Sequence, residues 1–276
     1  MSTVREHRFT PTEPVELYVE NARGIVRIES SDDGAVHVRV TGQRADEFVI
    51  EADGEQVRVV GPRRGGFGGR DTEAEVRIAT PDGNALAAKL GSSDLVSSAP
   101  LGRTWINSGS GDLRLASITG PYEVQSGSGD VTVEVATGIG RIKSGSGDVR
   151  LAEARGRLEL STGSGDVRLG HPYGPFTGKT GSGDVTVDEV ADDLTLNTGT
   201  GDLVVGHARA GRLDMVTASG DVRIGITAGT PVWTDLSTVT GAIASDLPAT
   251  GAPADGQDHV EVRARTATGD IALQAR

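Results

Sequence analysis

The sequence predicts an all-β protein, a single-chain β-solenoid with coils of about 18 residues. Three observations predict this fold: a Gly-Ser-Gly-Asp motif recurs at a fixed interval, apolar and polar residues alternate after each motif, and 40 glycines accompany few aromatic residues. No segment has the apolar period of about 3.6 residues that indicates an amphipathic helix. The general preference for right-handed crossover connections predicts a right-handed solenoid.

The repeated motif is Ser-Gly-Ser-Gly-Asp, with Thr in place of Ser in its last regular copy. The interval between its aspartates is constant from a degenerate copy at Asp94 to Asp202, and the next interval, to Asp221, is longer by a single residue. Segments 238–242 and 266–270 resemble two further copies with longer insertions. A fixed internal period is typical of stacked repeats. These positions define a predicted ladder of carboxylates: Asp94, Asp112, Asp130, Asp148, Asp166, Asp184, Asp202 and Asp221.

Two short strands are predicted in each coil. After each motif the first and third residues are apolar and the second is usually polar, as in Val131, Thr132 and Val133. A second apolar pair follows in the second half of the coil, as in Leu158 and Leu160. Alternation of β-favouring residues is typical of a strand with one buried face. Two such strands cannot bury their apolar faces alone, so neighbouring coils must stack and share a core.

The Ser-Gly-Ser-Gly segment is predicted to form the tight corner between the strands. Gly109, Gly111 and their equivalents are expected to take positive φ angles, which glycine adopts without steric cost. A small Ser or Thr is expected where the two sheets converge. Because stacked strands lie about 4.8 Å apart, equivalent residues of successive coils should form ladders.

The chain divides into two predicted regions. Residues 1–70 lack the period and are expected to form an N-terminal β-strand cap, because an open coil exposes unpaired backbone groups. The predicted strands of this cap are 15–20, 24–29, 35–40, 47–52 and 56–60. Residues 71–276 are expected to form the solenoid, and its last coil in the sequence should finish the stack. Within this region we distinguish core coils 90–237, an insertion 247–258 and a final coil 259–276.

Composition excludes several functional classes. A formal net charge of −12 disfavours nucleic acid and anionic membranes as partners, because both would be repelled. The absence of cysteine excludes disulfides and thiolate chemistry. No stretch approaches the roughly 20 apolar residues of a membrane span, and the start lacks the apolar region of a secretory signal. We therefore expect an acidic, glycine-rich cytoplasmic protein with no membrane insertion and no nucleic-acid partner.

Three stretches carry a resemblance to a known family: ENARGIVRIESSDDGAVHVRV at residues 20–40, the tandem SGSGD coils, and the closing TATGDIAL. On these the chain resembles the bacterial β-strand-repeat family of unknown function, which includes candidate adhesins and is related to toast-rack domains. The resemblance implies a single-chain β-solenoid, a role in envelope-stress signalling, adhesion or scaffolding, and no catalytic motif. In architecture alone the chain is similar to bactofilins, which are cytoplasmic β-helix polymers.

The aspartate ladder has two interpretations. Like carboxylates at strand spacing repel one another, so each needs hydrogen-bond donors or a cation. Calcium is the first, because β-roll toxins bind it with Gly- and Asp-rich repeats, but only one half of each coil here carries such a signature. We favour the second, in which each carboxylate accepts hydrogen bonds from backbone N–H groups of its own turn. No cofactor is then expected, with calcium or another divalent ion as the alternative.

A second column lies at a fixed position after the aspartates, near the end of each first strand. In the predicted register Glu153, His171, Glu189 and His207 stand on four successive coils, alternating acid and imidazole. One carboxylate and two imidazoles could hold a divalent metal ion, or an acid and a base could act as a pair. The alternative that we favour is an exposed ladder of alternating charge, which contributes little stability.

The Arg/Gly segment 63–70 has the composition of an RNA-binding segment, and our favoured interpretation is a loop that joins the cap to the solenoid. Outward arginines after the motifs form an interrupted set that an acidic polysaccharide could use. This set is Arg114, Arg150, Arg168 and Arg223.

No catalytic residue is predicted, because the chain lacks a GxSxG elbow, an HExxH motif and a P-loop. We therefore predict a non-enzymatic scaffold or interaction protein that binds a protein or polysaccharide partner and can assemble end to end. The alternative is a metal-dependent or carbohydrate-active enzyme that uses the Glu/His column.

Overall fold

The computed structural model describes residues 2–62, 73–248 and 258–276. Within these ranges every regular element is a β-strand except one short 3₁₀ helix, η1 (Ala45–Glu47), so the predicted all-β solenoid is confirmed. None of the described helical residues forms a helix long and apolar enough to cross a membrane. The Arg/Gly segment 63–70 and residues 249–257 of the predicted insertion lie outside the described residues.

Contacts divide the chain into two compact units, Met1–Ile139 and Gly140–Arg276. The predicted division into residues 1–70 and 71–276 was drawn on a different basis, the presence of the repeated motif. The strands of the first unit are β1 (Thr3–Phe9), β2 (Glu16–Ser30), β3 (Val36–Gly42), β4 (Val49–Ala52), β5 (Gln56–Val60), β6 (Ala74–Thr80), β7 (Ala85–Ser97), β8 (Thr104–Ser108), β9 (Leu113–Ile118), β10 (Tyr122–Ser126) and β11 (Val131–Ala136).

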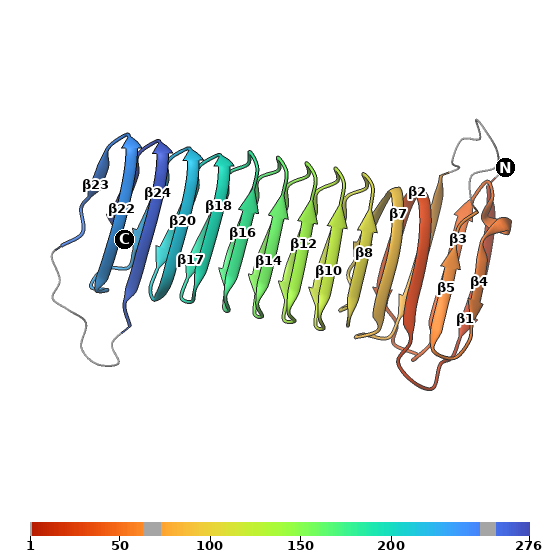
Figure 1. The fold of residues 1–276 in the computed structure, drawn as a ribbon. Helices are drawn as coiled ribbons and strands as arrows, with labels where there is room; N and C mark the ends of the chain where they lie inside the picture. Colours follow the sequence, from red (N-terminus) through yellow and green to blue (C-terminus); the bar gives the residue numbers. More distant parts are fainter. Residues whose placement is uncertain (1, 63–72, 249–257) are drawn as a thin grey trace, which may run out of the picture. The chain divides into compact units, whose positions relative to one another are not determined.

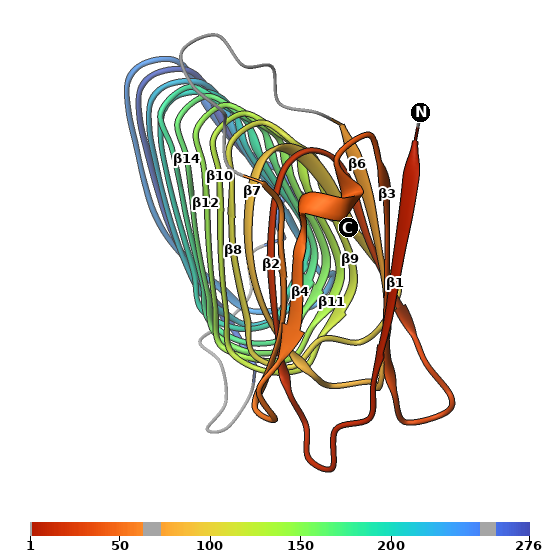
Figure 2. The same ribbon diagram turned by 90° about the vertical axis from the view of Figure 1, so that its right-hand side faces the viewer.

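In the first unit, β2 and β7 are long strands that bend from one sheet face to the other (Figure 2). The segment Glu16–Glu20 of β2 pairs with β5, whereas its segment Gly24–Ser30 pairs with β6. From β7 onward the strands pair in parallel, β8 with β10 on one face and β9 with β11 on the other. The two predicted strands 15–20 and 24–29 are therefore parts of one continuous strand.

The start of the first unit is antiparallel. β1 pairs with β3, β3 with β6, and β4 with β5, which together form the cap (Figure 2). β1 and β6 are not among the strands that the sequence predicts. In β1, Arg5 and His7 stand opposite the buried Val40 and Val38. Arg5 also donates hydrogen bonds to the carbonyl oxygens of Asp46 and Phe48, so β1 is tied to η1.

In the second unit, the strands of residues 140–248 and 258–276 pair with one another in parallel (Figure 1). On one face the order is β12–β14–β16–β18–β20–β24–β22, and on the other it is β13–β15–β17–β19–β21–β25–β23. These strands are β12 (Gly140–Ser144), β13 (Val149–Ala154), β14 (Leu158–Thr162), β15 (Val167–Pro172), β16 (Phe176–Thr180), β17 (Val185–Val190), β18 (Leu194–Thr200), β19 (Leu203–Ala208), β20 (Gly211–Ser219), β21 (Val222–Ile226), β22 (Val232–Thr240), β23 (Ile243–Ser245), β24 (Val260–Thr268) and β25 (Ile271–Ala275).

The last coil in the sequence is not the last coil of the stack, so that prediction was wrong. β24 pairs with both β20 and β22, which places the coil 260–275 between its two predecessors (Figure 1). The physical reason is the interior side chains. Val262 and Leu273 are buried, whereas their partners in the outer coil are Thr234 and Ser245, which are exposed. The more apolar coil takes the position that is covered on both sides.

Buried hydroxyl groups close the corners of the coils, where a small Ser or Thr was expected. Ser144 Oγ donates to the carbonyl of Gly147 at 2.8 Å, and Thr162 Oγ1 accepts from the N–H of Gly165 at 3.1 Å. The side chains of both residues are almost fully buried.

Glycine is required at the corners for a different reason from the one predicted. Gly109 and Gly111 do not have positive φ angles. A Cβ atom on Gly111 would lie 2.0 Å from the carbonyl oxygen of Ser93, and one on Gly165 would lie 2.1 Å from that of Gly147. Close stacking of one corner on the next therefore excludes a side chain. Among the described copies of the repeated motif, positive φ occurs only at the later corners: Gly201, Gly220, Gly241 and Gly269.

Candidate functional site

The ladder carboxylates bind backbone groups of the neighbouring coil. In the first unit Asp94 Oδ1 accepts from the N–H of Asp112 at 2.9 Å, and Asp112 Oδ1 accepts from that of Asp130 at 3.1 Å. The donor thus belongs to the next coil, not to the same turn as predicted. In the second unit the same bond joins Asp148 to Asp166, Asp166 to Asp184, Asp184 to Asp202, Asp202 to Asp221, and Asp221 to Asp270.

Arginines of the chain donate to the second carboxylate oxygen at the ladder positions Asp112, Asp148, Asp202 and Asp221. Arg114 donates to Asp112 Oδ2 at 3.0 Å, and Arg150 donates to Asp148 Oδ2 at 2.8 Å. Arg223 bridges two ladder positions, Asp202 and Asp221. Arg168 instead donates to Asp188, outside the ladder. The other three outward arginines neutralise ladder carboxylates, which offsets part of the repulsion between the carboxylates.

The Glu/His column is aligned as the period predicts. Glu153 stands opposite His171, and Glu189 stands opposite His207. His171 Nδ1 lies 3.4 Å from Glu189 Oε2, and Arg155 donates to Glu153 at 3.1 Å. The side chains of His171 and Glu189 are 44% and 48% exposed. In the part of the chain that the structure describes, no group of three or more His, Asp or Glu side chains is placed to hold a metal ion.

A site that the sequence did not indicate lies on the outward face of the first unit. Tyr18 of β2, Ala87 of β7 and Trp105 of β8 stand side by side across three strands. Along its own strand each of these residues lies between two buried residues, as Trp105 lies between Thr104 and Ile106. All three side chains therefore point away from the core. The signal was present in the alternation of residues 104–108, where an inward Ile106 implies an outward Trp105.

A hollow of about 640 Å³ lies beside Trp105. Its polar side chains are Glu20, Asn21, Lys89 and Asn107, together with hydroxyl groups at the sheet corner. Lys89 Nζ lies 3.6 Å from Glu20 Oε1 and donates to the Tyr18 hydroxyl at 3.0 Å. The Tyr18 hydroxyl also raises the pKa of Lys89, so its ammonium group stays charged. The hollow therefore has an aromatic wall formed by Trp105, one negative and one positive side chain that pair with each other, and the amide group of Asn107.

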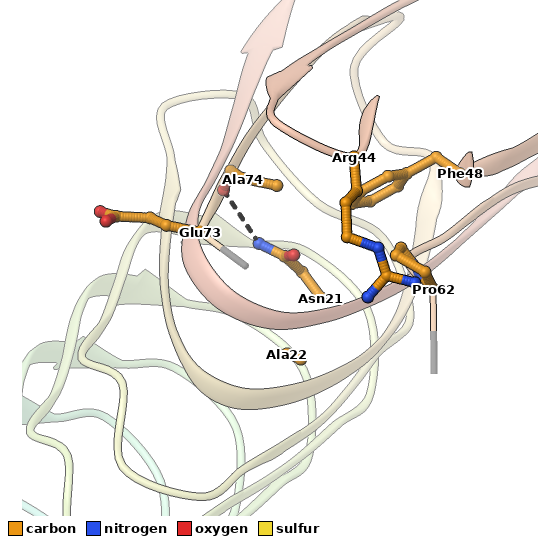
Figure 3. Close-up of a pocket in the computed structure, with 8 residues that line it drawn as sticks. Asn21, Ala22, Arg44, Phe48, Pro62, Glu73 and Ala74 are labelled. Carbon is orange, nitrogen blue, oxygen red and sulfur yellow. Dashed lines mark hydrogen bonds between the residues drawn. The ribbon is translucent and has the colours of Figure 1, made fainter. Parts of the chain in front are cut away.

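A narrow hollow adjoins it at the bend of β2 (Figure 3). Asn21 is buried there, and its Nδ2 donates to the carbonyl of Ala74 at 3.3 Å and to Ser93 Oγ at 2.9 Å. Arg44 and Phe48 form the opposite wall. The free space is about 20 Å³, which suits a water molecule and no larger ligand. Asn21 therefore fixes the bend of β2.

A third hollow, of about 460 Å³, lies on the outward face of the cap. Arg39 and Arg77 are direct cross-strand partners there, and His37 is a neighbour. Asp33 accepts from the N–H of Ala35, its largest stabilising contact, and pairs with His37, which lowers the pKa of Asp33 to about 2. Ion pairs within the protein thus neutralise many of the charged side chains on this surface.

Solved structures of several bacterial proteins are similar to this chain. A candidate lipid-binding protein from Parabacteroides distasonis is 17% identical and has a TM-score of 0.42, over 99% of this chain and 96% of that one. A candidate adhesin from Parabacteroides merdae is 12% identical with a TM-score of 0.40, over 99% and 96% of the two chains. A candidate adhesin from Bacteroides fragilis is 11% identical with a TM-score of 0.35, over 98% and 97%.

No curated protein sequence matches this chain. Residues 15–172, more than half of the chain, match the description of one family. This segment contains the bent strand β2, the cap strands β3 to β6 and several of the regular coils. The chain belongs to the Toastrack DUF4097 family.

Proposed function

We propose that this chain is a non-enzymatic, adhesin-like interaction protein that binds a protein or polysaccharide partner through the outward faces of its sheets. One observation carries the proposal: the repeated carboxylates accept backbone hydrogen bonds from the next coil, and at least four of them also pair with arginines. The residues that recur most often in the chain therefore build the stack. Recognition falls to outward side chains that do not recur, of which Trp105 and its hollow are the clearest case.

Family membership supports this proposal at the level of fold and broad class. The arrangement of the Glu/His column supports it as well. His171 and Glu189 form an exposed pair, and Glu153 is engaged by Arg155. An exposed row of this kind lacks the enclosed, water-excluding environment in which an acid and a base usually act on a bound substrate.

The experiment measures binding and turnover together. The purified full chain is mixed with insoluble polysaccharides, sedimented, and the supernatant is assayed both for unbound protein and for released reducing ends, with and without EDTA. The proposal expects that the chain sediments with at least one polysaccharide, that EDTA does not change this fraction, and that no reducing ends appear. Release of reducing ends, or binding that EDTA abolishes, would contradict it and favour the metal-dependent or carbohydrate-active alternative.

A further inference from the structure

The hollow beside Trp105 has the chemistry of a saccharide subsite. We propose that it binds a neutral oligosaccharide, with one sugar ring stacked on the indole of Trp105. This inference rests on the proposed function and names its site and partner class. The ring, the charge, the hydrogen-bonding groups and the strand pairing around the hollow each support it.

The indole of Trp105 is an available stacking surface. Its cross-strand neighbour on β7 is Ala87, whose methyl group leaves space beside the ring. In the described part of the chain, no other ring and no cation packs on this indole. Trp105 is half-buried, so its ring is held in place while part of it faces the hollow. A fixed, partly exposed indole suits the C–H face of a pyranose, because it offers a large apolar area at low entropic cost.

Tyr18 has a supporting role. Arg58 and Lys89 both lie over its ring, 5.5 and 5.4 Å from the centroid, and occupy it by cation–π contacts. Its hydroxyl accepts from Lys89 at 3.0 Å and donates to Glu20. Tyr18 therefore orients Lys89 and Glu20 at the edge of the hollow, and Trp105 remains the stacking residue.

The charge of the hollow favours a neutral ligand. Glu20 and Lys89 lie 3.6 Å apart and balance each other, and no further charged side chain lines it among the described residues. A phosphate or uronate would need a surplus of cationic donors, as in the bidentate pairing that arginine provides. Asn107, by contrast, is exposed and offers both a donor and an acceptor, which match sugar hydroxyl groups.

The strand pairing disfavours an extended peptide as the occupant. Peptides commonly bind a sheet by adding a strand to a free edge. Here β7 is paired with β2 and β8, and β8 is also paired with β10, so the strands below the hollow have no free edge. Outward polar side chains continue along β10, where Gln125 stands opposite Asn107. A sugar chain that runs across the strands can contact this row.

The size of the hollow agrees with a saccharide. Its volume of about 640 Å³ lies within the range of about 300–1,000 Å³ that is typical of ligand sites. Trp105 on β8 and Glu20 on β2 both line the hollow, and their strands are two apart in the sheet, which is about 9.6 Å at ordinary strand spacing. A span of this order accommodates a disaccharide unit on Trp105 with its neighbouring ring near Lys89.

The test uses calorimetric titration of the full chain with cellohexaose and with hexa-N-acetylchitohexaose, two neutral probes that differ in the N-acetyl group. We expect binding of at least one of them, and Trp105→Ala should weaken it by at least about tenfold. Trp233→Ala, at a tryptophan that is 60% exposed in the second unit, is the matched control and should bind as wild type does. Trp105→Phe should restore part of the affinity, and circular dichroism should show that every variant is folded.

The outcomes separate this inference from the proposed function. Equal binding by wild type and Trp105→Ala would overturn the Trp105 site and leave the proposed function standing. Binding of an acidic hexasaccharide in preference to both neutral probes, or no binding of any soluble saccharide, would overturn the choice of ligand. Cleavage of a probe during the titration would instead overturn the proposed function, because it would show turnover.

Discussion

The cap of the first unit and the regular coils of the second use the same residue types for different purposes. In the cap, Asp33 accepts a hydrogen bond from Ala35 in its own turn, and Gly34 has a φ angle of 71°. In the coils, Asp184 accepts from the N–H of Asp202 in the next coil. Gly165 is required because a Cβ atom would meet the carbonyl oxygen of Gly147 at 2.1 Å.

The difference teaches that an Asp/Gly pair in a β protein has two physical meanings. In a single turn, glycine supplies a backbone conformation and aspartate closes the turn locally. In a stack, glycine supplies the absence of a side chain, and aspartate joins one layer to the next. Only the second meaning produces a strict period, because each coil must offer the same groups to its neighbour.

The largest expected effect comes from the coil glycine. Gly165→Ala places a methyl group against the Gly147 carbonyl and should destabilise the chain by about 3 kcal/mol, because the stacked backbone cannot move aside. Gly34→Ala in the cap has open space and should cost only about 1 kcal/mol, through its left-handed φ.

Substitution by asparagine distinguishes the two reasons for glycine, the left-handed φ at Gly34 and the close backbone packing at Gly165. Asparagine tolerates the left-handed region, so Gly34→Asn should recover much of the loss, whereas Gly165→Asn should be at least as damaging as Gly165→Ala. Unfolding midpoints in urea measure both pairs. Similar behaviour of the two glycines would show that the coil corner is a conformational turn after all.

A smaller effect is expected at the ladder. Asp184→Ala removes the acceptor for the Asp202 N–H, which is partly solvated, and should cost about 1 kcal/mol. Asp184→Asn keeps an acceptor oxygen and removes one negative charge from the column, so its stability should stay closer to wild type. Thermal unfolding measures both variants, and a calcium-dependent stability in wild type that Asp184→Asn lacks would indicate a cation site instead.

The cap aspartate should have a pH signature. Its contacts with Ala35 and His37 lower the pKa of Asp33 to about 2 from an ordinary value of 3.8. Its contribution to stability is therefore present above about pH 4 and is lost as the pH falls towards 2. Carbon-13 NMR titration of the Asp33 carboxyl measures the shift directly. A midpoint near 3.8, or the same acid sensitivity in Asp33→Asn, would refute the contacts described here.

The sequence predicted the coils better than the cap, and the reason is repetition. Val131 and Val133 belong to a pattern seen after every motif aspartate from Asp112 to Asp221, so chance alternation was excluded, and both are buried. β1 and β6 occur once, and the residues of β1 are largely polar, as in Arg5 and His7. Their pairing depends on contacts with β3 that no local pattern shows.

The order of the last coils and the Trp105 hollow depend on tertiary placement. Both final coils carry a degenerate copy of the motif, and the outer one has Ala242 where the inner one has Asp270. The outer coil also has Thr234 and Ser245 at interior positions where the inner one has Val262 and Leu273. Trp105 could be assigned to an outward face from its neighbour Ile106, but the hollow needs Glu20 and Lys89 from other strands. The Glu/His column followed directly from the period, since it is set by register alone.

The smallest expected effect is at that column. His171→Ala removes an exposed pair with Glu189 and should change the free energy of unfolding by less than about 1 kcal/mol. His171→Ala combined with His207→Ala should change neither saccharide binding nor bound metal. Urea unfolding and elemental analysis check this. A metal bound stoichiometrically by wild type and lost in the double variant would assign the column a function.

The most direct test compares the affinity for the better of the two neutral hexasaccharides in Trp105→Ala and Asp184→Asn. The central claim is that repeated residues build the stack and that a non-repeated outward face binds the partner. Titration calorimetry should then show at least about tenfold weaker binding for Trp105→Ala and wild-type binding for Asp184→Asn. Loss of binding in Asp184→Asn, with Trp105→Ala unchanged, would contradict the claim.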